Sequence, residues 1–311
     1  MGGGLDRRLE HDVVTKPRLL VVGAGGQVGH EVESAPEAAG FELVALVRRE
    51  LDIVERDAVF AAMRRLGPDA VVNCAGFTAV DRAESESDAA FSANAQGAAN
   101  LAEACREHGA PLVQLSTDYV FDGRKAGPYR EDDAVAPLNV YGASKAAGEA
   151  VVRAAGGRYA ILRTSWVYGP HGHNFARTML RLARERDKLA VVDDQRCAPT
   201  ASIDVARAIL AVMAAFLLER REVTGIYHFT ARGETTWFGF AQEIFAAAAA
   251  RGFAVPRLEP IASANYPSAA RRPPNSVLDC TRFERTFALA RRPWQDGIPA
   301  LVATLLAEVD A

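Results

Sequence analysis

The fold of this chain is decided by the stretch Leu19-Leu20-Val21-Val22-Gly23-Ala24-Gly25-Gly26-Gln27-Val28-Gly29. Its first four residues are apolar and end in a β-branched pair, which is typical of a strand buried in a parallel sheet. The glycines suit a tight turn and let the backbone approach a pyrophosphate at the start of a helix. A glycine cluster alone is weak evidence. Because this one stands between a predicted strand and a predicted helix, it indicates a dinucleotide-binding βαβ unit.

Strands and helices alternate onward from this stretch. Predicted strands at 41–47, 70–74, 112–116 and 159–164 are separated by predicted helices at 56–66, at 79–108 and from about Tyr141. This alternation predicts an α/β fold with a doubly wound parallel sheet, Rossmann-like in topology. Ligands of such sheets bind beyond the carboxyl ends of the strands.

The pattern loosens after Gly169. Later elements are predicted as helices at 174–186, 202–220, 237–251 and 299–308 and as short strands near 189–192 and 226–229. We therefore expect a flexible N-terminal extension (1–17), an NAD(P)-binding Rossmann domain (18–168) and a smaller lobe (169–311). That lobe is expected to bind mainly the substrate and to interleave with the Rossmann domain.

The composition is that of a globular protein with neither a polyanion partner nor a membrane anchor. The 311 residues are 49% apolar and 24% charged, with a net charge of −3, and no long basic run predicts a nucleic-acid partner. The longest apolar stretch, 205–218, is too short to span a bilayer, and the N-terminus lacks an apolar signal segment. We expect a cytoplasmic protein with reduced cysteines, because its four cysteines have no zinc-binding spacing.

The segment after the second strand concerns the choice of cofactor. NAD-binding folds usually place an acid here for the ribose 2′-hydroxyl, whereas this chain has Val47-Arg48-Arg49. Two guanidinium groups could bind a 2′-phosphate, so NADPH is favoured over NADH, which stays an alternative. Asp52 and Ile53 are expected near the adenine. The competing interpretation is that all four are ordinary solvated loop residues.

The candidate chemistry lies on the helix expected from Tyr141. Tyr141 and Lys145 are four residues apart and share a helix face, where an ammonium group would lower the pKa of a phenol. Alone, such a pair is more often two ordinary residues on a solvated face. The predicted topology, however, brings both to the strand end that carries Ser116 and Thr117. A hydroxyl, a phenol and an ammonium group beside a nicotinamide site can together reduce a ketone.

Several longer motifs carry a resemblance. These are the glycine spacing GxxGxxG at 23–29, Tyr141-x-x-x-Lys145, and the blocks at 78–84, 116–123, 139–145, 163–168, 194–195, 198–200 and 272–276. With them the chain resembles the dTDP-4-dehydrorhamnose reductase family of extended short-chain dehydrogenases/reductases, from about Arg18 almost to its end. The resemblance implies reduction of the C4 ketone of dTDP-4-dehydro-β-L-rhamnose by NAD(P)H. This reaction is the last step of dTDP-L-rhamnose synthesis for cell-surface polysaccharide such as lipopolysaccharide O-antigen.

The same resemblance implies roles for individual residues. Tyr141 would be the proton donor, Lys145 would lower its pKa and hold the nicotinamide ribose, and Thr117 would hydrogen-bond the ketone oxygen. The residues implied to line the cofactor are Gly23, Gly25, Gly26, Gln27, Val28, Ala75, Gly76 and Thr78. Those implied to contact the sugar, besides Thr117, are Asp118, Trp166 and Asn174.

Some questions stay open at this stage. The family commonly has glycine where Cys197 stands, which leaves the local loop conformation open. Some members are described as using magnesium at a dimer contact, and Glu31 matches one such position, although an exposed glutamate in the first helix turn also suits the helix dipole. No full ligand set is visible for it or for His171 and His173, so we predict no metal site, while a homodimer stays an alternative. Two alternative functions are reduction of another nucleotide-linked 4-ketosugar and a non-catalytic NADP-binding regulatory subunit, such as that of methionine adenosyltransferase.

Overall fold

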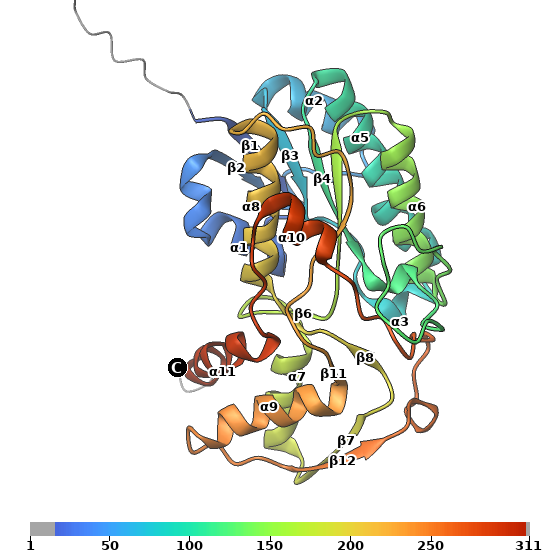
Figure 1. Cartoon of the computed structure of the whole chain (residues 1–311), viewed down its shortest axis with the longest axis vertical. Helices are drawn as coiled ribbons and strands as arrows, with labels where there is room; N and C mark the ends of the chain where they lie inside the picture. Colours follow the sequence, from blue (N-terminus) through green and yellow to red (C-terminus); the bar gives the residue numbers. More distant parts are fainter. Residues whose placement is uncertain (1–15, 309–311) are drawn as a thin grey trace, which may run out of the picture.

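A six-stranded parallel sheet organises the structure, a computed structural model that describes residues 16–308 (Figure 1). All neighbouring strands pair in parallel. Their order across the sheet is β10 (Gly225–His228), β5 (Tyr159–Thr164), β4 (Leu112–Thr117), β3 (Ala70–Asn73), β1 (Arg18–Val22) and β2 (Glu42–Leu46). The predicted doubly wound α/β fold is confirmed. The N-terminal extension predicted at 1–17 lies almost wholly outside the described residues.

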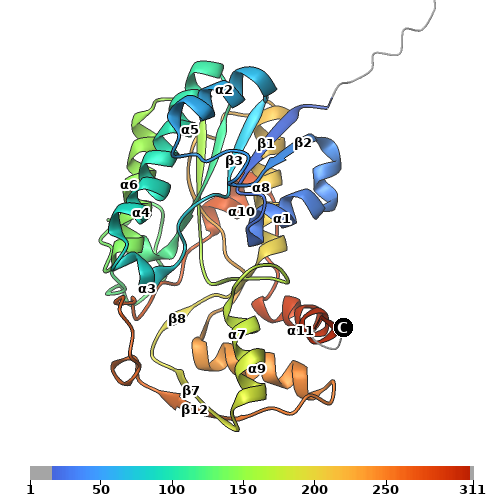
Figure 2. The ribbon, with the colours of Figure 1, turned by 180° about the vertical axis from the view of Figure 1, so that it is seen from behind.

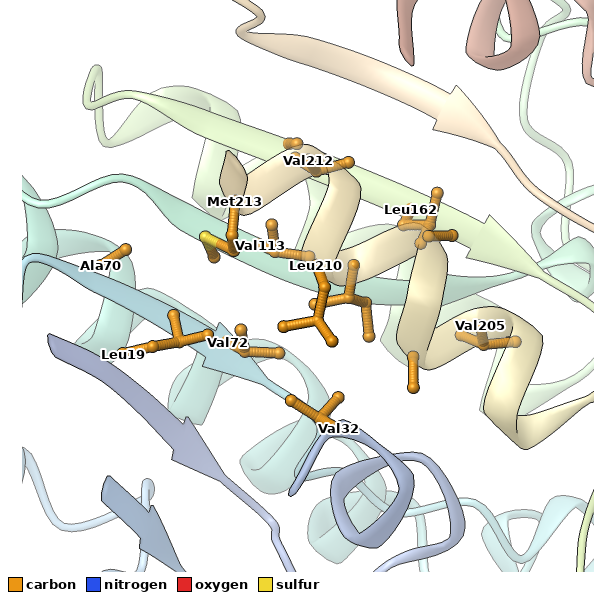
Figure 3. Close-up of a cluster of buried hydrophobic side chains, with 14 of the residues drawn as sticks. Leu19, Val32, Ala70, Val72, Val113, Leu162, Val205, Leu210, Val212 and Met213 are labelled. Atoms are coloured by element: carbon orange, nitrogen blue, oxygen red, sulfur yellow. The ribbon is translucent and has the colours of Figure 1, made fainter. Parts of the chain in front are cut away.

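The four central strands, β5, β4, β3 and β1, are buried on both faces, which explains their apolar runs. Leu19 and Val21 belong to one buried cluster, while Leu20 and Val22 belong to another. The first cluster lies under α1 (Gln27–Ser34) and α8 (Ser202–Leu217), which pack on each other (Figure 3). The second lies under α2 (Arg56–Leu66), α5 (Gly97–His108) and α6 (Val140–Ala154), on the opposite face.

The C-terminal part returns to this sheet. Helix α8 covers one face, and β10 forms an edge beside β5. Helix α10 (Thr281–Phe287) packs beside both, and most of the other elements build a lobe beyond one end of the sheet (Figures 1 and 2). That lobe has its own core, formed by α7 (Phe175–Glu185), α9 (Trp237–Ala249) and α11 (Ile298–Ala307), with β7 (Lys188–Val192) paired to β12 (Arg257–Ile261). The expected interleaving is thus present, while the boundary at 168/169 stays a prediction.

The single helix expected over 79–108 is wrong. The chain forms α3 (Val80–Ala83), α4 (Ser87–Phe91), a π-helical turn η2 (Ser92–Gln96) and then α5. Glu86 leaves helical geometry, at φ −120° and ψ 45°. The π-helical turn contains Asn94, whose side chain is fully used in tertiary hydrogen bonds. Contacts outside the helix therefore override its propensity here.

Several small elements are not expected from the sequence. They are β6 (Val167–Tyr168) paired with β9 (Thr200–Ala201), β8 (Arg196–Cys197) paired with β11 (Thr235–Thr236), and α10 (Thr281–Phe287). Strands of two residues have no periodicity to detect, because they exist only through their partners. Within residues 16–308, no helix combines the length and apolar character needed to cross a bilayer.

Candidate active site

The glycine loop packs against the loop that follows β3. Gly23 has φ +78°, and a Cβ on it would lie 2.4 Å from the backbone nitrogen of Ala75. The backbone nitrogens of Gly23 and Ala24 both donate to the carbonyl of Leu46, at 3.0 and 3.1 Å. The loop thus lies where the strand order reverses between β1 and β3, the usual ligand position in such sheets. Helix α1 starts there without a side-chain cap, which leaves N–H groups for an anion.

A cavity of about 460 Å³ opens beside this loop. Of the predicted cofactor residues, it is lined by Gly23, Gly25, Gly26, Arg48, Arg49, Asp52, Ile53, Ala75 and Gly76. Gln27, Val28, Thr78, Tyr141 and Lys145 are not among its lining residues. Gln27 instead donates to the carbonyl of His173 at 3.2 Å, and Val28 is buried. The structure therefore brings most of the predicted set together around one elongated space.

The two arginines at the rim of this cavity differ. Nε of Arg48 lies 3.0 Å from a carboxylate oxygen of Asp52, whose other oxygen accepts from the backbone nitrogen of Val54 at 3.1 Å. Asp52 therefore holds the loop and Arg48, in addition to any contact with adenine. Arg49 is exposed and enters none of the ion pairs among residues 16–308. Arg49 is thus the guanidinium group that needs no exchange of partner to bind a phosphate.

Helix α6 is placed by its first turn. Asn139 caps it by accepting a hydrogen bond from the backbone nitrogen of Gly142 at 2.7 Å. A Cβ on Gly142 would lie 2.2 Å from the carbonyl oxygen of Tyr119, so glycine lets the helix start press directly on the turn after β4. This close approach brings the Tyr141 phenol near the Thr117 hydroxyl, which acts on its pKa.

The two titratable groups on α6 have opposite pKa shifts. Burial raises the pKa of Tyr141 to about 12, while the hydrogen bond from Thr117 acts in the lowering direction. Burial lowers the pKa of Lys145 to about 8, and its Nζ donates to the carbonyl of Leu115 at 2.6 Å. The expected lowering of the Tyr141 pKa by Lys145 is therefore wrong for the chain by itself. Desolvation of the phenol and the adjacent Asp118 carboxylate both raise this pKa, and Lys145 is not among the groups that shift it.

Asp118 follows Thr117 in the chain and hydrogen-bonds to it. Its side chain is buried, and it accepts from the Thr117 hydroxyl at 3.0 Å and from the Cys197 thiol at 3.4 Å. Burial raises its pKa to about 6. The Sγ atom of Cys197 also lies 3.3 Å from the carbonyl oxygen of Ser276, the alternative acceptor for its single proton. Cys197 thus connects the reaction side of the sheet to the segment between β12 and α10.

An ion pair between Arg272 and Asp81 holds that segment against α3. Arg272 Nη2 lies 2.7 Å from a carboxylate oxygen of Asp81, and the other oxygen accepts from the backbone nitrogen of Ala270 at 3.0 Å. Hydrogen bonds from the Arg272 guanidinium hold the pKa of the Asp81 carboxyl well below its usual range. Both residues belong to motifs noted in the sequence, and the structure joins them across 191 positions.

Trp166 stands at the junction of sheet and lobe. Its φ of +42° is unusual for a bulky residue, and its ring stacks on Trp237 with centroids 3.6 Å apart and planes 12° apart. The Trp237 indole donates to Gln195 at 3.2 Å, whereas the buried Trp166 Nε1 has no partner within the described chain. A strained, stacked indole with a free donor fits a ligand-contact position.

Comparisons with known proteins agree with this geometry. Residues 17–307 match the family model described as the RmlD substrate binding domain. A dTDP-4-dehydrorhamnose reductase of Aggregatibacter actinomycetemcomitans is 42% identical, covering 90% of this chain and 97% of the relative. The chain belongs to the dTDP-4-dehydrorhamnose reductase family. The resemblance expected from the motifs is confirmed.

Solved structures of the family superpose over nearly the whole chain. The dTDP-4-dehydrorhamnose reductase of Clostridium acetobutylicum has a TM-score of 0.86 at 36% identity, covering 93% of this chain and 99% of that one. The reductase of Bacillus anthracis, solved in complex with NADP, has a TM-score of 0.83 at 34% identity, covering 94% and 100%. The lobe and the sheet therefore both follow the family fold.

Asn174 has a different setting from the one expected for a family sugar contact. Its amide nitrogen donates to Gln27 at 3.1 Å and to the carbonyl of Gly169 at 2.8 Å. Its oxygen caps α7 by accepting from the backbone nitrogen of Arg177 at 3.1 Å. All its polar atoms are thus engaged by protein, and it joins the glycine loop to the lobe. A sugar contact by Asn174 stays a prediction without support from this geometry.

The expectation of an exposed, first-turn Glu31 is wrong. Glu31 is 8% exposed, lies beyond the first turn of α1, and accepts from the Ser202 hydroxyl at 3.1 Å. His171 stacks on His30, with ring centroids 3.6 Å apart. Residues 16–308 contain no cluster of three metal-binding side chains. The predicted lack of a metal site stays a prediction, and the structure adds no ligand set for magnesium.

Two residues of the site are missed by reasoning from the sequence. Asn94 accepts from the backbone nitrogen of Phe77 at 2.8 Å and donates to the Ser144 hydroxyl at 2.9 Å, so it ties the cavity loop to α6. A signal is present, because Ser92, Asn94 and Gln96, followed by Gly97, are weak helix formers or polar residues within an expected 30-residue helix. Trp237 falls in a predicted helix without any role. Only its stacking on Trp166 reveals one.

Proposed function

We propose that this protein catalyses the NADPH-dependent reduction of the C4 ketone of dTDP-4-dehydro-β-L-rhamnose, giving dTDP-β-L-rhamnose. This is the last step of dTDP-L-rhamnose synthesis for cell-surface polysaccharide. The observation that carries the proposal is the meeting of Thr117 and Tyr141, with Lys145 bonded to the end of the same strand. They stand beside a glycine-lined cavity in a chain that belongs to this family throughout its length.

The cavity fits a phosphorylated dinucleotide. The space that a Cβ on Gly23 would fill is already occupied by backbone, so only glycine allows this approach of loop to loop. The uncapped start of α1 can receive the pyrophosphate, and Arg49, with Arg48 beside it, can receive a 2′-phosphate. When bound, NADPH supplies the hydride that adds to the ketone carbon. NADH stays the alternative donor.

Tyr141 supplies the proton. Its raised pKa keeps the phenol protonated at neutral pH, ready to donate as negative charge develops on the ketone oxygen. The Thr117 hydroxyl, which donates to Asp118 in this structure, can stabilise that charge by turning its proton to the same oxygen. After donation, Lys145 and Thr117 are the groups that can stabilise the phenolate. Hydride and proton together convert the ketone to the secondary alcohol.

The sugar is expected between the sheet and the lobe. Asp118 and Trp166 are the candidates for contact, Asp118 next to Thr117 and Trp166 with its unpartnered indole N–H. The complete Thr117, Tyr141 and Lys145 set argues against a purely regulatory, non-catalytic subunit. Nothing in the geometry favours a different nucleotide-linked 4-ketosugar, so that alternative is left to the product analysis.

The decisive experiment generates the dTDP-4-keto-6-deoxysugar in situ and follows NADPH absorbance at 340 nm, with product identification by NMR. We expect NADPH oxidation and a product with the rhamno configuration. A talo or other product would assign a sister reductase. Tight NADPH binding with no oxidation would contradict the proposal and favour the regulatory alternative.

A further inference from the structure

A buried chain of polar groups runs from α6 through the sheet to its edge. Glu149 on α6 accepts from the Ser116 hydroxyl at 2.6 Å, and it binds Arg163 at 2.8 and 2.6 Å. The side chains of Arg163 and Glu149 are only 2% and 5% exposed. The bidentate pair is therefore fixed in position and shielded from water.

This network of polar side chains continues to β10. Arg163 Nη1 lies 3.3 Å from His228 Nε2, while His228 Nδ1 lies 3.1 Å from the carbonyl of Tyr129. Burial and the adjacent Arg163 lower the pKa of His228 to about 3, so the ring is neutral. A neutral ring protonated on Nδ1 donates to Tyr129 and accepts from Arg163, which satisfies both nitrogens. Glu149 is thus the carboxylate that pairs with Arg163, while the buried Glu131 accepts from the backbone nitrogen of His228 at 3.2 Å.

Glu149 stands one helical turn after Lys145, on the same face of α6. The charged or titratable groups that act on Lys145 are Glu149 and, from the loop after β3, the Cys74 thiol. Burial raises the pKa of Cys74 to about 12, so that thiol is neutral. From β4 the ammonium group receives only the neutral carbonyl of Leu115. Glu149, itself paired with Arg163, is therefore the only carboxylate among the groups that act on this desolvated ammonium group.

We propose that Glu149 is a positioning residue for the reduction. Held by Arg163 and Ser116, its carboxylate keeps the buried Lys145 protonated and oriented toward the cavity. The inference deepens the proposed function and rests on it. Because a buried ion pair by itself contributes little net stability, the charge acts here mainly through Lys145.

The test is the pH dependence of NADPH binding, followed by nucleotide fluorescence, with the kcat profile measured in parallel. Lys145 must be protonated to act, so function is present below its pKa of about 8 and is lost above it. Glu149→Gln keeps the shape and removes the charge, which lowers that pKa further. We expect the basic limb of both profiles to move about one pH unit downward, a roughly fivefold loss at pH 8.

Three further variants separate this role from a structural one. Asp204→Asn breaks another ion pair, in which Asp204 and Arg292 lie 2.6 Å apart. Because neither residue acts on Lys145, this variant should leave the basic limb of both pH profiles unmoved. Glu149→Asp restores the charge and should return the limb toward its wild-type position. Glu149→Gln/Arg163→Met removes both buried charges, which covers the case that the single variant does not fold.

An unmoved basic limb in folded Glu149→Gln, or in the double variant, overturns the inference. The binding profile needs no turnover. If the wild-type protein binds NADPH but reduces no ketosugar, the proposed function is wrong. The pH dependence of NADPH binding still tests whether Glu149 acts on Lys145.

Discussion

The two sides of the candidate site are built differently. The cofactor wall, formed by residues 23–26, 47–54 and 74–76, comes from three short segments and includes the glycine loop, where backbone approaches backbone. The proposed substrate wall, formed by Asp118, Trp166, Cys197 and Trp237, consists of side chains that meet from distant segments, such as Cys197 with Asp118 across 79 positions. Backbone sites follow from local sequence, whereas side-chain sites follow from packing. The difference predicts which substitutions act on one ligand only.

Removing the acid that stands between the walls should have the largest effect. Tyr141→Phe deletes the phenolic proton and leaves both walls in place. We expect turnover to fall by about 10²–10⁴-fold, the usual range for a general acid, with NADPH affinity nearly unchanged. Steady-state kinetics and fluorescence titration measure the two quantities. Retained turnover would mean that another group, such as water, donates the proton.

A substitution in the cofactor wall should weaken NADPH binding by displacing the backbone of the glycine loop. In Gly23→Ala, the new Cβ would meet Ala75 at 2.4 Å, at a φ of +78°. We expect NADPH affinity to fall about 10–100-fold, because such strain is of order 1–3 kcal/mol and the loop must move. Gly67→Ala is the matched control, since Gly67 has φ +54° and a Cβ added there would meet no atom within 4 Å. Equal losses in both variants would show that the loop-to-loop contact is unimportant.

A substitution in the proposed substrate wall should weaken sugar binding by removing the stacking of the two indole rings. Trp237→Ala removes the ring on which Trp166 rests, while Trp237→Phe keeps an aromatic face. We expect the alanine variant to raise the KM for the sugar about tenfold, consistent with the loss of an aromatic pair worth about 0.5–1.5 kcal/mol. NADPH affinity should stay the same. A loss of NADPH binding instead would show that the two walls are not independent.

The smallest effect is expected at the cavity rim. Arg48→Ala should raise the KM for NADPH about threefold more than that for NADH, and Arg49→Ala somewhat more, because Arg48 is shared with Asp52. The ratio of the two Michaelis constants is the measurement. An equal change for both cofactors would count against a 2′-phosphate contact by these residues.

Local pattern alone is enough for much of the fold. Helix 56–66 and strand 159–164 are predicted with the bounds that the structure has. The spacing of Tyr141 and Lys145 places both on α6 without knowledge of any contact. These features depend on periodicity, turn residues and the register of neighbouring positions, which the chain carries within a few residues.

Tertiary structure decided the rest. The break in the helix expected over 79–108, the burial of Glu31 and the engagement of Asn174 all depend on partners that lie far away in the chain. The pKa of Tyr141 depends on how much water the assembled site removes, which no spacing encodes. The sequence by itself therefore determined the sheet, the glycine loop and the candidate catalytic residues. Only packing decided their electrostatics and the wall that faces the sugar, because desolvation and long-range contacts arise when the chain is folded.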